Sequence, residues 1–151
     1  MPTAATQTIA PRLEPDRAAP GVNRAMIAFD DAIELEPRLR ELVRIRASQI
    51  NGCAYCLDLH TRDALAAGED ERRLATLAGW RESVFFTERE RAAFAFTDEV
   101  TRIGDRGVTD EVWSAAAAHF DERELAELLW AIVAINAWNR IAVATHTVPE
   151  S

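Results

Sequence analysis

The chain contains no lysine, so all 17 of its cationic side chains are arginines. They are outnumbered by 25 acidic residues, which gives a formal net charge of -8. A chain with this charge balance lacks the basic surface that binds nucleic acid, and an anionic membrane would repel it. We therefore expect neither a nucleic-acid partner nor a membrane partner.

Proline is absent from a long internal stretch. Four of the six prolines lie within the first 20 residues, and none occurs between Pro37 and Pro149. Because proline interrupts helices, this distribution predicts an extended N-terminal arm over residues 1–20 and one helical domain over residues 21–151. The domain is long enough to bury a core of its own.

Strand-like alternation is also absent, as is an N-terminal positive cluster followed by an apolar run. The second absence argues against a secretory signal and predicts a cytoplasmic protein. Helical periodicity and cap residues predict a single all-α bundle of about six to seven helices. We expect helices over residues 23–36, 37–50, 53–67 and 70–79, and three more after the N-caps Thr87, Thr109 and Asp121.

The expected last helix, which ends near Thr145, is apolar almost all round. Such a helix is buried on every side, which is difficult in a chain of this size, so we expect a homo-oligomer. The alternative is a helix in the middle of a monomeric bundle. Asn139 interrupts the apolar pattern together with Trp138 and Arg140, and it is expected to make a structural hydrogen bond or to border a site.

Only two cysteines occur, and both belong to the motif Cys53-Ala-Tyr-Cys56, with His60 four residues later. On a helix, the three side chains share one face, within an arc of roughly 60°. Gly52 ends the preceding helix, so Cys53 lies where free backbone N–H groups and the helix dipole favour a thiolate. In a reducing compartment such a pair is typical of redox, catalytic or metal-binding sites.

A thiolate, a second thiol and a proton carrier are the groups needed to reduce a peroxide through a sulfenic acid and a disulfide. Two alternatives remain open at this point. One is a zinc site in which His119 or His146 completes the ligands Cys53, Cys56 and His60. The other is a redox-inactive oligomeric binding protein with two inert, buried cysteines.

The segment from Glu41 to His60 reads ELVRIRASQINGCAYCLDLH. It resembles the carboxymuconolactone decarboxylase superfamily, in its AhpD-like alkylhydroperoxidase branch. The resemblance is strongest over residues 36–68 and rests on a glutamate twelve residues before the Cys-x-x-Cys motif and a histidine four residues after it. It implies an AhpD-like helical bundle that forms a homo-oligomer, for which we expect a hexamer or a trimer, and a thiol-dependent peroxidase without cofactor or metal.

By position, the resemblance implies Cys56 as the peroxidatic cysteine and Cys53 as its proton donor and disulfide partner. His60 and Glu41 would form a proton relay. The implied substrate is a small hydroperoxide, and the implied reductant is a thioredoxin-like or lipoyl-type thiol. Lactone decarboxylation is less expected, because the decarboxylase branch lacks this cysteine pair. The position of Cys53 at a helix start favours Cys53 as the more acidic thiol. We nevertheless assign the attack on peroxide to Cys56, as the resemblance implies, because His60 lies one turn after Cys56.

Two further residues are expected near the site. Ser48 lies on the same helix face as Glu41, and Tyr55 lies between the cysteines. Studied peroxidase members have a histidine at the position of Tyr55. Tyrosine donates a hydrogen bond but is a poor proton shuttle near neutral pH, so this departure leaves the disulfide chemistry intact and puts efficient turnover in question.

Overall fold

The computed structural model describes residues 9–150, which form helices and connecting turns without any strand. This confirms the expected all-α class. Along the chain the elements are α1 (Pro15–Ala18), α2 (Pro20–Asp31), α3 (Pro37–Asn51), α4 (Ala54–Ala66), α5 (Glu71–Thr76), the 3-10 turn η1 (Leu77–Gly79), α6 (Glu88–Thr101), α7 (Asp110–His119) and α8 (Glu122–Thr145).

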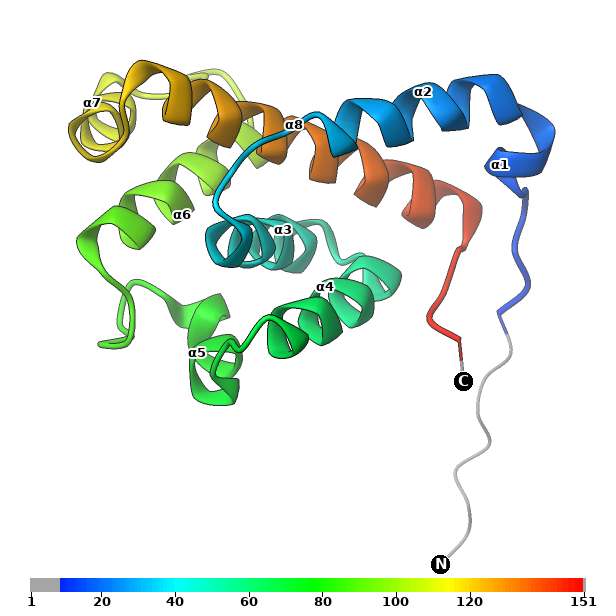
Figure 1. Cartoon of the computed structure of the whole chain (residues 1–151), viewed down its shortest axis with the longest axis horizontal. Coiled ribbons are helices and arrows are strands. Elements are labelled where there is room, and N and C mark those ends of the chain that lie inside the picture. Colours follow the sequence, from blue (N-terminus) through cyan, green and yellow to red (C-terminus); the bar gives the residue numbers. More distant parts are fainter. Residues whose placement is uncertain (1–8, 151) are drawn as a thin grey trace, which may run out of the picture.

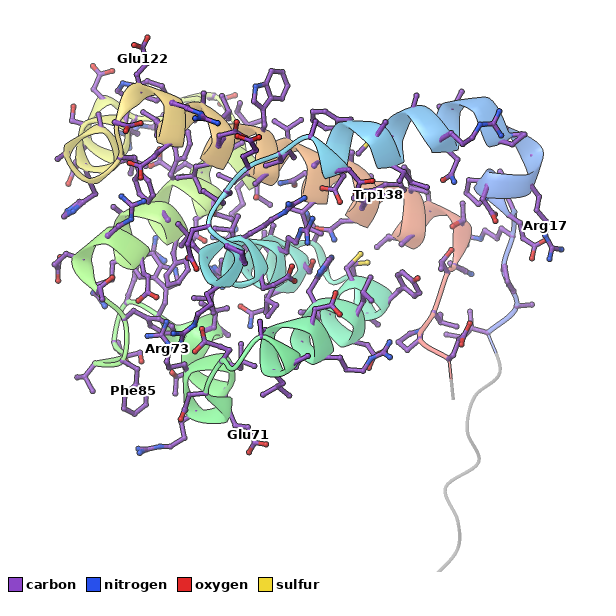
Figure 2. All side chains as sticks on the ribbon, in the orientation of Figure 1. Arg17, Glu71, Arg73, Phe85, Glu122 and Trp138 are labelled. Atoms are coloured by element: carbon purple, nitrogen blue, oxygen red, sulfur yellow. The ribbon has the colours of Figure 1, made fainter. Side chains whose placement is uncertain are left out.

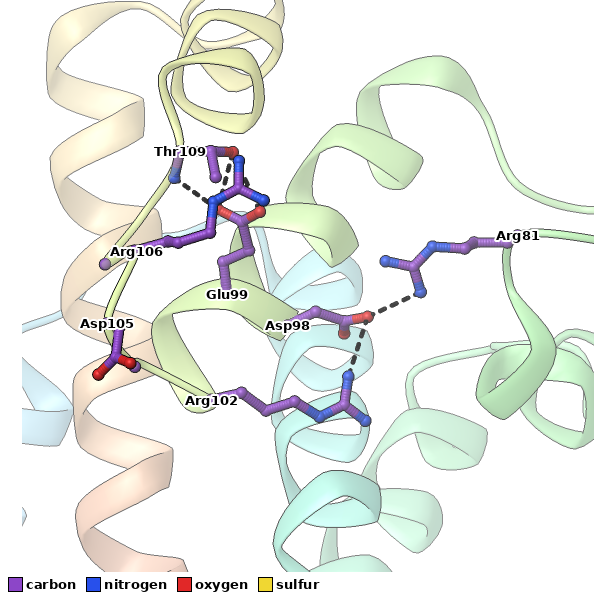
Figure 3. Close-up of a pocket in the computed structure, with 9 residues that line it drawn as sticks. Arg81, Asp98, Glu99, Arg102, Asp105, Arg106 and Thr109 are labelled. Carbon is purple, nitrogen blue, oxygen red and sulfur yellow. Dashed lines mark hydrogen bonds and ion pairs between the residues drawn. The ribbon is translucent and has the colours of Figure 1, made fainter.

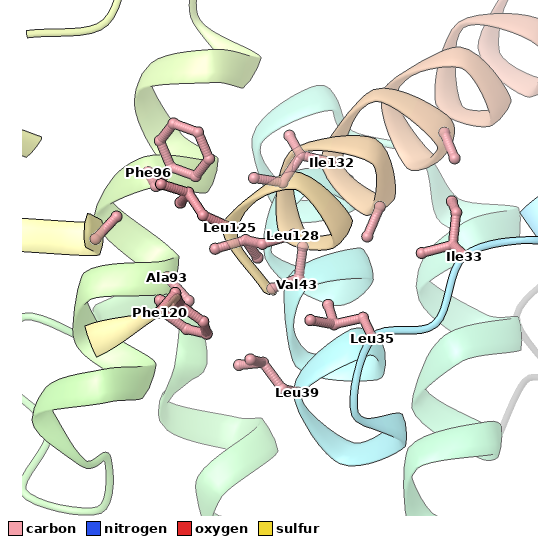
Figure 4. Packing of buried hydrophobic residues seen from close by; sticks show 13 residues of the cluster. Ile33, Leu35, Leu39, Val43, Ala93, Phe96, Phe120, Leu125, Leu128 and Ile132 are labelled. Carbon is pink, nitrogen blue, oxygen red and sulfur yellow. The ribbon is translucent and has the colours of Figure 1, made fainter. Parts of the chain in front are cut away.

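Helix α3 lies at the centre of the molecule and packs against α4, α6 and α8 (Figure 1). The main core forms where α3, α6 and α8 meet (Figure 4). Val43, Leu128 and Ile132 have no exposed surface there. Burial of each such side chain contributes about 1.5–3 kcal/mol, so this contact fixes α3, which carries half of the candidate site.

The first long helix differs from the sequence prediction at both ends. Helix α2 begins at Pro20 and ends at Asp31, whereas residues 23–36 were expected to be helical. Glu36 is instead the N-cap of α3, and its carboxylate accepts hydrogen bonds from the backbone N–H groups of Arg38 and Leu39 at 3.0 and 2.9 Å. The reason is Pro37, because the residue before a proline is disfavoured in a helix.

The expected N-terminal arm is only partly covered by the structure, since residues 1–8 lie outside the described residues. Within the described part, α1 forms a helical turn and α2 already begins at Pro20. The arm is therefore not extended throughout. Proline suits the first turn of a helix, where its missing N–H has no partner to lose, and both helices use it in this way.

The remaining helix starts agree with their caps. Asp70, Thr87, Thr109 and Asp121 each accept a hydrogen bond from the first turn of the helix that follows. Ile103 continues the apolar spacing of Phe96 and Val100, but it lies beyond the end of α6 and is 68% exposed.

Arg73 ties α5 to the start of α6. Its guanidinium contacts Glu69 at 2.7 Å, the carboxylate of Glu90 and the carbonyl oxygen of Phe85. Figure 2 shows Arg73 and Phe85 at this corner of the molecule. The corner lies away from the cysteines, so we interpret it as a structural connection.

Helix α8 is buried on one side only in the single chain. Its inner face fills the core, but Trp130, Val133 and Val143 are 53%, 38% and 47% exposed. The prediction of burial on every side is therefore not met within one chain. By length and composition alone α8 could span a membrane, but a helix in a protein core can be just as long and apolar. Here α8 packs against α3 and α6.

Candidate functional site

The turn between α3 and α4 positions the two cysteines. It contains Gly52 in the left-handed region, with a φ of 67°, a conformation that glycine adopts without a Cβ clash. Cys53 follows as the N-cap of α4, and its Sγ accepts a hydrogen bond from the backbone N–H of Cys56 at 3.4 Å. Cys53 thus lies at the start of a helix, where the sequence places it.

The two thiols face each other inside the protein. Both cysteines are free, and the Sγ atoms of Cys53 and Cys56 lie 2.7 Å apart. Only 1% of Cys53 and 3% of Cys56 is exposed. Since a disulfide needs a separation of about 2.05 Å, a small movement of either side chain would allow the bond to form.

The two thiols differ strongly in acidity. The hydrogen bond that Cys56 donates lowers the pKa of Cys53 to about 6, against the opposing effect of burial. The backbone N–H of Cys56, the Asn139 amide and the charge of His60 also lower this pKa. The same thiol–thiol hydrogen bond, followed by burial, raises the pKa of Cys56 above its ordinary value. The resting state therefore has a thiolate on Cys53 and a proton on Cys56.

The lower pKa of Cys53 agrees with its position at the start of a helix, whereas the family resemblance implies that Cys56 attacks the peroxide. The two statements concern different steps, because acidity at rest and access to a substrate need not favour the same sulfur. A proton that moves from Cys56 to Cys53 along their 2.7 Å contact would transfer the charge to Cys56.

Glu41 and His60 meet at the face of α3 that covers α4. The Nδ1 atom of His60 lies 2.9 Å from Oε2 of Glu41. Arg44, one turn further along α3, donates to the other carboxylate oxygen at 2.6 Å and also binds Asp30 of α2. Burial raises the pKa of Glu41, but the hydrogen bond with His60 and the charge of Arg44 outweigh it and lower the pKa overall. Glu41 is therefore an anion that holds His60 in a fixed orientation.

Ser48 and Tyr55, both expected near the site, lie close to the cysteines. Ser48 is fully buried, donates to the carbonyl oxygen of Arg44 at 2.7 Å and accepts from Nδ2 of Asn139 at 2.9 Å. Tyr55 is partly buried against the small apolar cluster that contains both cysteines, together with Trp138 of α8. Neither residue makes a direct hydrogen bond to His60 among the contacts of the described residues.

Sequence reasoning gave too little weight to Arg44 and Asn139. An arginine one turn after a glutamate is usually a surface ion pair, but here Glu41 contacts Arg44 and His60 at once. Asn139 was expected chiefly as a structural hydrogen-bonding residue. The signal that could have raised its weight is a fully buried amide in an otherwise apolar helix, which requires specific partners.

The zinc alternative is not supported by the geometry. Within residues 9–150, one group of three ligand-type side chains has donor atoms within 4.8 Å of one another, and it consists of Glu41, His60 and Asp63. The cysteines do not belong to it, and Arg44 on Glu41 opposes a cation there. His119 lies at the end of α7 and is not part of this group.

A cavity of about 470 Å³ lies away from the cysteines, at the C-terminal end of α6 (Figure 3). Asp98 forms its floor and is bound by Arg46 at 2.6 Å and by Arg81 at 3.0 Å. The three arginines that line the cavity are balanced by three acidic side chains. Arg81 and Arg102 both pair with Asp98, and Glu99 binds Thr109, so we interpret the cavity as part of a structural polar network.

Comparison with known proteins identifies the lineage. Residues 20–99 match the model of the carboxymuconolactone decarboxylase family. The chain belongs to this family. It is also 43% identical to YdfG, an uncharacterised protein of Bacillus subtilis strain 168, over 105 residues that cover 70% of this chain and 71% of YdfG.

Solved structures of similar proteins have the same fold. A protein from Agrobacterium tumefaciens, described as a candidate antioxidant defence protein AhpD, superposes with a TM-score of 0.90 at 36% identity. The match covers 94% of this chain and 100% of that protein. This likeness supports the AhpD-like branch of the family.

The debrominase Bmp8 also shares the fold, with a TM-score of 0.77 at 22% identity over 89% of this chain and 74% of its own. At that identity the likeness concerns the fold alone. It nevertheless shows that this fold carries more than one activity, so the proposed chemistry must be argued from the side chains of this chain.

Proposed function

We propose that the protein is a thiol-dependent peroxidase that reduces a small hydroperoxide and closes a disulfide between Cys53 and Cys56. The observation that carries the proposal is the pair of free, buried thiols 2.7 Å apart, one with a lowered pKa and the other protonated. We assign proton delivery to the Glu41–His60 pair, because the charge of His60 acts on Cys53 and Glu41 holds the ring in place. The AhpD-type description of the Agrobacterium relative supports the same class of chemistry.

In the first step, the proton of Cys56 passes to the Cys53 thiolate, and Cys56 attacks the terminal oxygen of the hydroperoxide. The O–O bond breaks, the Cys56 sulfur is oxidised to a sulfenic acid, and the alkoxide leaves. Cys53 returns its proton to the alkoxide, which departs as an alcohol.

In the second step, the Cys53 thiolate attacks the sulfenic sulfur and forms the disulfide. The expelled hydroxide takes a proton from His60 and leaves as water. Glu41 keeps His60 oriented through their 2.9 Å contact. A thioredoxin-like or lipoyl-type dithiol then reduces the disulfide, as expected for a protein in the reducing cytoplasm. The burial of both sulfurs favours a small substrate.

The decisive test is consumption of tert-butyl hydroperoxide by the reduced protein, followed together with two variants. Cys56→Ser should abolish consumption. Cys53→Ser should consume one equivalent of hydroperoxide and then stop, with a sulfenic acid left on Cys56 that dimedone labels. His119→Gln, at the end of α7, is a control that should match wild type. Peroxide consumption by Cys56→Ser at the wild-type rate would refute the mechanism.

We also propose that the protein is a homo-oligomer, as a trimer or hexamer. The support is the exposed side of α8, where Trp130, Val133 and Val143 remain accessible in the single chain. Val22 and Ile27 of the neighbouring helix α2 are 73% and 44% exposed as well. Contact with a second copy would remove this apolar surface from water.

A further inference from the structure

We propose that Asn139 is the residue that binds the anionic sulfur of the dithiol, with Ser48 and Asn51 as the positioning residues that aim its amide. This inference deepens the proposed function, since it names the group that stabilises the charge on the two sulfurs. It begins with an anomaly: Asn139 is fully buried in the middle of the apolar helix α8. A buried amide is costly unless each of its polar atoms has a partner.

The position of Asn139 on α8 directs its side chain toward the cysteines. Ile135 and Ala142 lie one turn before it and one turn after it, on the same helix face. Both belong to the small buried cluster that contains Cys53 and Cys56. Asn139 is therefore the polar residue on the stripe of α8 that covers the dithiol.

The hydrogen-bond network fixes which way the amide points. The single proton of the Ser48 hydroxyl is donated to the carbonyl oxygen of Arg44 at 2.7 Å, so Ser48 can only accept from Asn139. The atom of Asn139 that lies 2.9 Å from Ser48 must then be the nitrogen. The amide oxygen accepts from Nδ2 of Asn51 at 2.9 Å.

An amide nitrogen carries two hydrogens, and Ser48 takes only one of them. The second is available to the sulfur atoms. The largest influence on both thiols is their mutual hydrogen bond, which lowers the pKa of Cys53 and raises that of Cys56. A hydrogen bond from Asn139, by contrast, lowers the pKa of both thiols. Asn139 thus favours the charge on either sulfur.

This has a consequence for the reaction. At rest, Cys56 donates its backbone N–H to Cys53. The lowered pKa of Cys53 and the raised pKa of Cys56 assign the proton of their 2.7 Å thiol–thiol contact to Cys56 as well. Once the proton has moved to Cys53, Cys56 is a thiolate and no longer has an S–H group to donate. The Asn139 amide remains a donor in both states, so it keeps the charge stabilised while the proton moves between the sulfurs.

The matched control for Asn139 is Asn136, one turn earlier on the same helix. Asn136 also contacts Asn51, at 3.0 Å, but its Nδ2 donates to Thr101 at 3.0 Å and to the backbone of Ile132. Replacement of Asn136 therefore removes a similar amide and a similar contact to Asn51, but it leaves the Asn139 amide in place beside the sulfurs.

The test is the pH dependence of iodoacetamide alkylation of the reduced full chain, with the modified cysteine located by peptide mass. In wild type, Cys53 should be the alkylated residue, with reactivity that rises with pH through a midpoint of about 6. In Asn139→Ala the midpoint should rise by about one to two pH units, the usual effect of a lost hydrogen bond to a charged group. Asn136→Ala should keep the wild-type midpoint.

If Asn139→Ala does not fold, Ser48→Ala replaces it, since this variant keeps the amide but removes the acceptor that aims it. It should shift the midpoint in the same direction by a smaller amount. An unchanged midpoint in the folded variant, or an equal rise in Asn136→Ala, would overturn the proposal. Because no peroxide is used, this outcome is independent of whether the protein consumes hydroperoxide.

Discussion

At the scale of single residues, the proposed mechanism separates the acidity of Cys53 from proton delivery by His60. Cys53 owes its low pKa first to the thiol of Cys56, and then to the start of α4 and to Asn139. His60 owes its orientation to Glu41, which Arg44 keeps charged. The thiolate and the proton carrier are thus set by different partners and can be perturbed one at a time.

Glu41→Gln should slow peroxide consumption by about a hundredfold, because the neutral amide no longer holds His60 as an oriented proton carrier. The thiolate on Cys53 should persist, since its main hydrogen bonds come from Cys56. Stopped-flow measurement of peroxide consumption checks the rate, and alkylation of Cys53 checks the thiolate. The control is Glu34→Gln, an exposed glutamate paired with Arg123. A rate in Glu41→Gln equal to that of the control would contradict a relay role for Glu41.

The placement of the cysteine pair at the start of a helix that also carries His60 was predictable from spacing and from Gly52, because one short segment contains all these positions. Glu41 required the family resemblance, since nothing local distinguishes it from a solvated carboxylate. Arg44 and Asn139 could not be assigned from the sequence, because their roles depend on how α3 packs against α2 and α8.

At the scale of elements, the α3–α4 turn aims the dithiol. Gly52→Ala should lower the free energy of unfolding by about 1–2 kcal/mol, because a Cβ is strained at its φ of 67°. A Cβ built there meets nothing within 4 Å, so the cost is purely one of backbone conformation. Gly79→Ala is the control, since a Cβ is equally free of contacts there and Gly79 does not have a positive φ.

Denaturant unfolding measures both variants. The account of the turn fails if Gly52→Ala is as stable as Gly79→Ala. A displaced Cys53 should also weaken its role as N-cap, so the alkylation midpoint of Gly52→Ala is expected to rise.

Most helix starts were predictable because short-range capping chemistry determines them, as at Thr87 and Asp121. The end of α2 was not, because the apolar spacing continues through Ile33 although the helix has already stopped at Asp31. Ile33 is buried from the connecting loop instead. Periodicity alone cannot distinguish a buried helix residue from a buried loop residue.

At the scale of the whole molecule, the exposed side of α8 is the feature that a single chain leaves unexplained. If the proposed oligomer uses this side, Trp130→Glu should weaken assembly and shift the mass measured by light scattering toward the 16.8 kDa of one chain. The control is Val84→Glu in the loop before α6, where the side chain is 88% exposed. A wild-type protein that is already monomeric at micromolar concentration would refute the proposal.

The central claim is that the two thiols are the redox centre, and one mass measurement tests it most directly. Fully reduced protein is mixed with one equivalent of tert-butyl hydroperoxide, quenched with acid and weighed intact by mass spectrometry. The account predicts a loss of about two daltons, together with one peptide-mapped bond between Cys53 and Cys56. An unchanged mass, with the hydroperoxide left unconsumed, would contradict it.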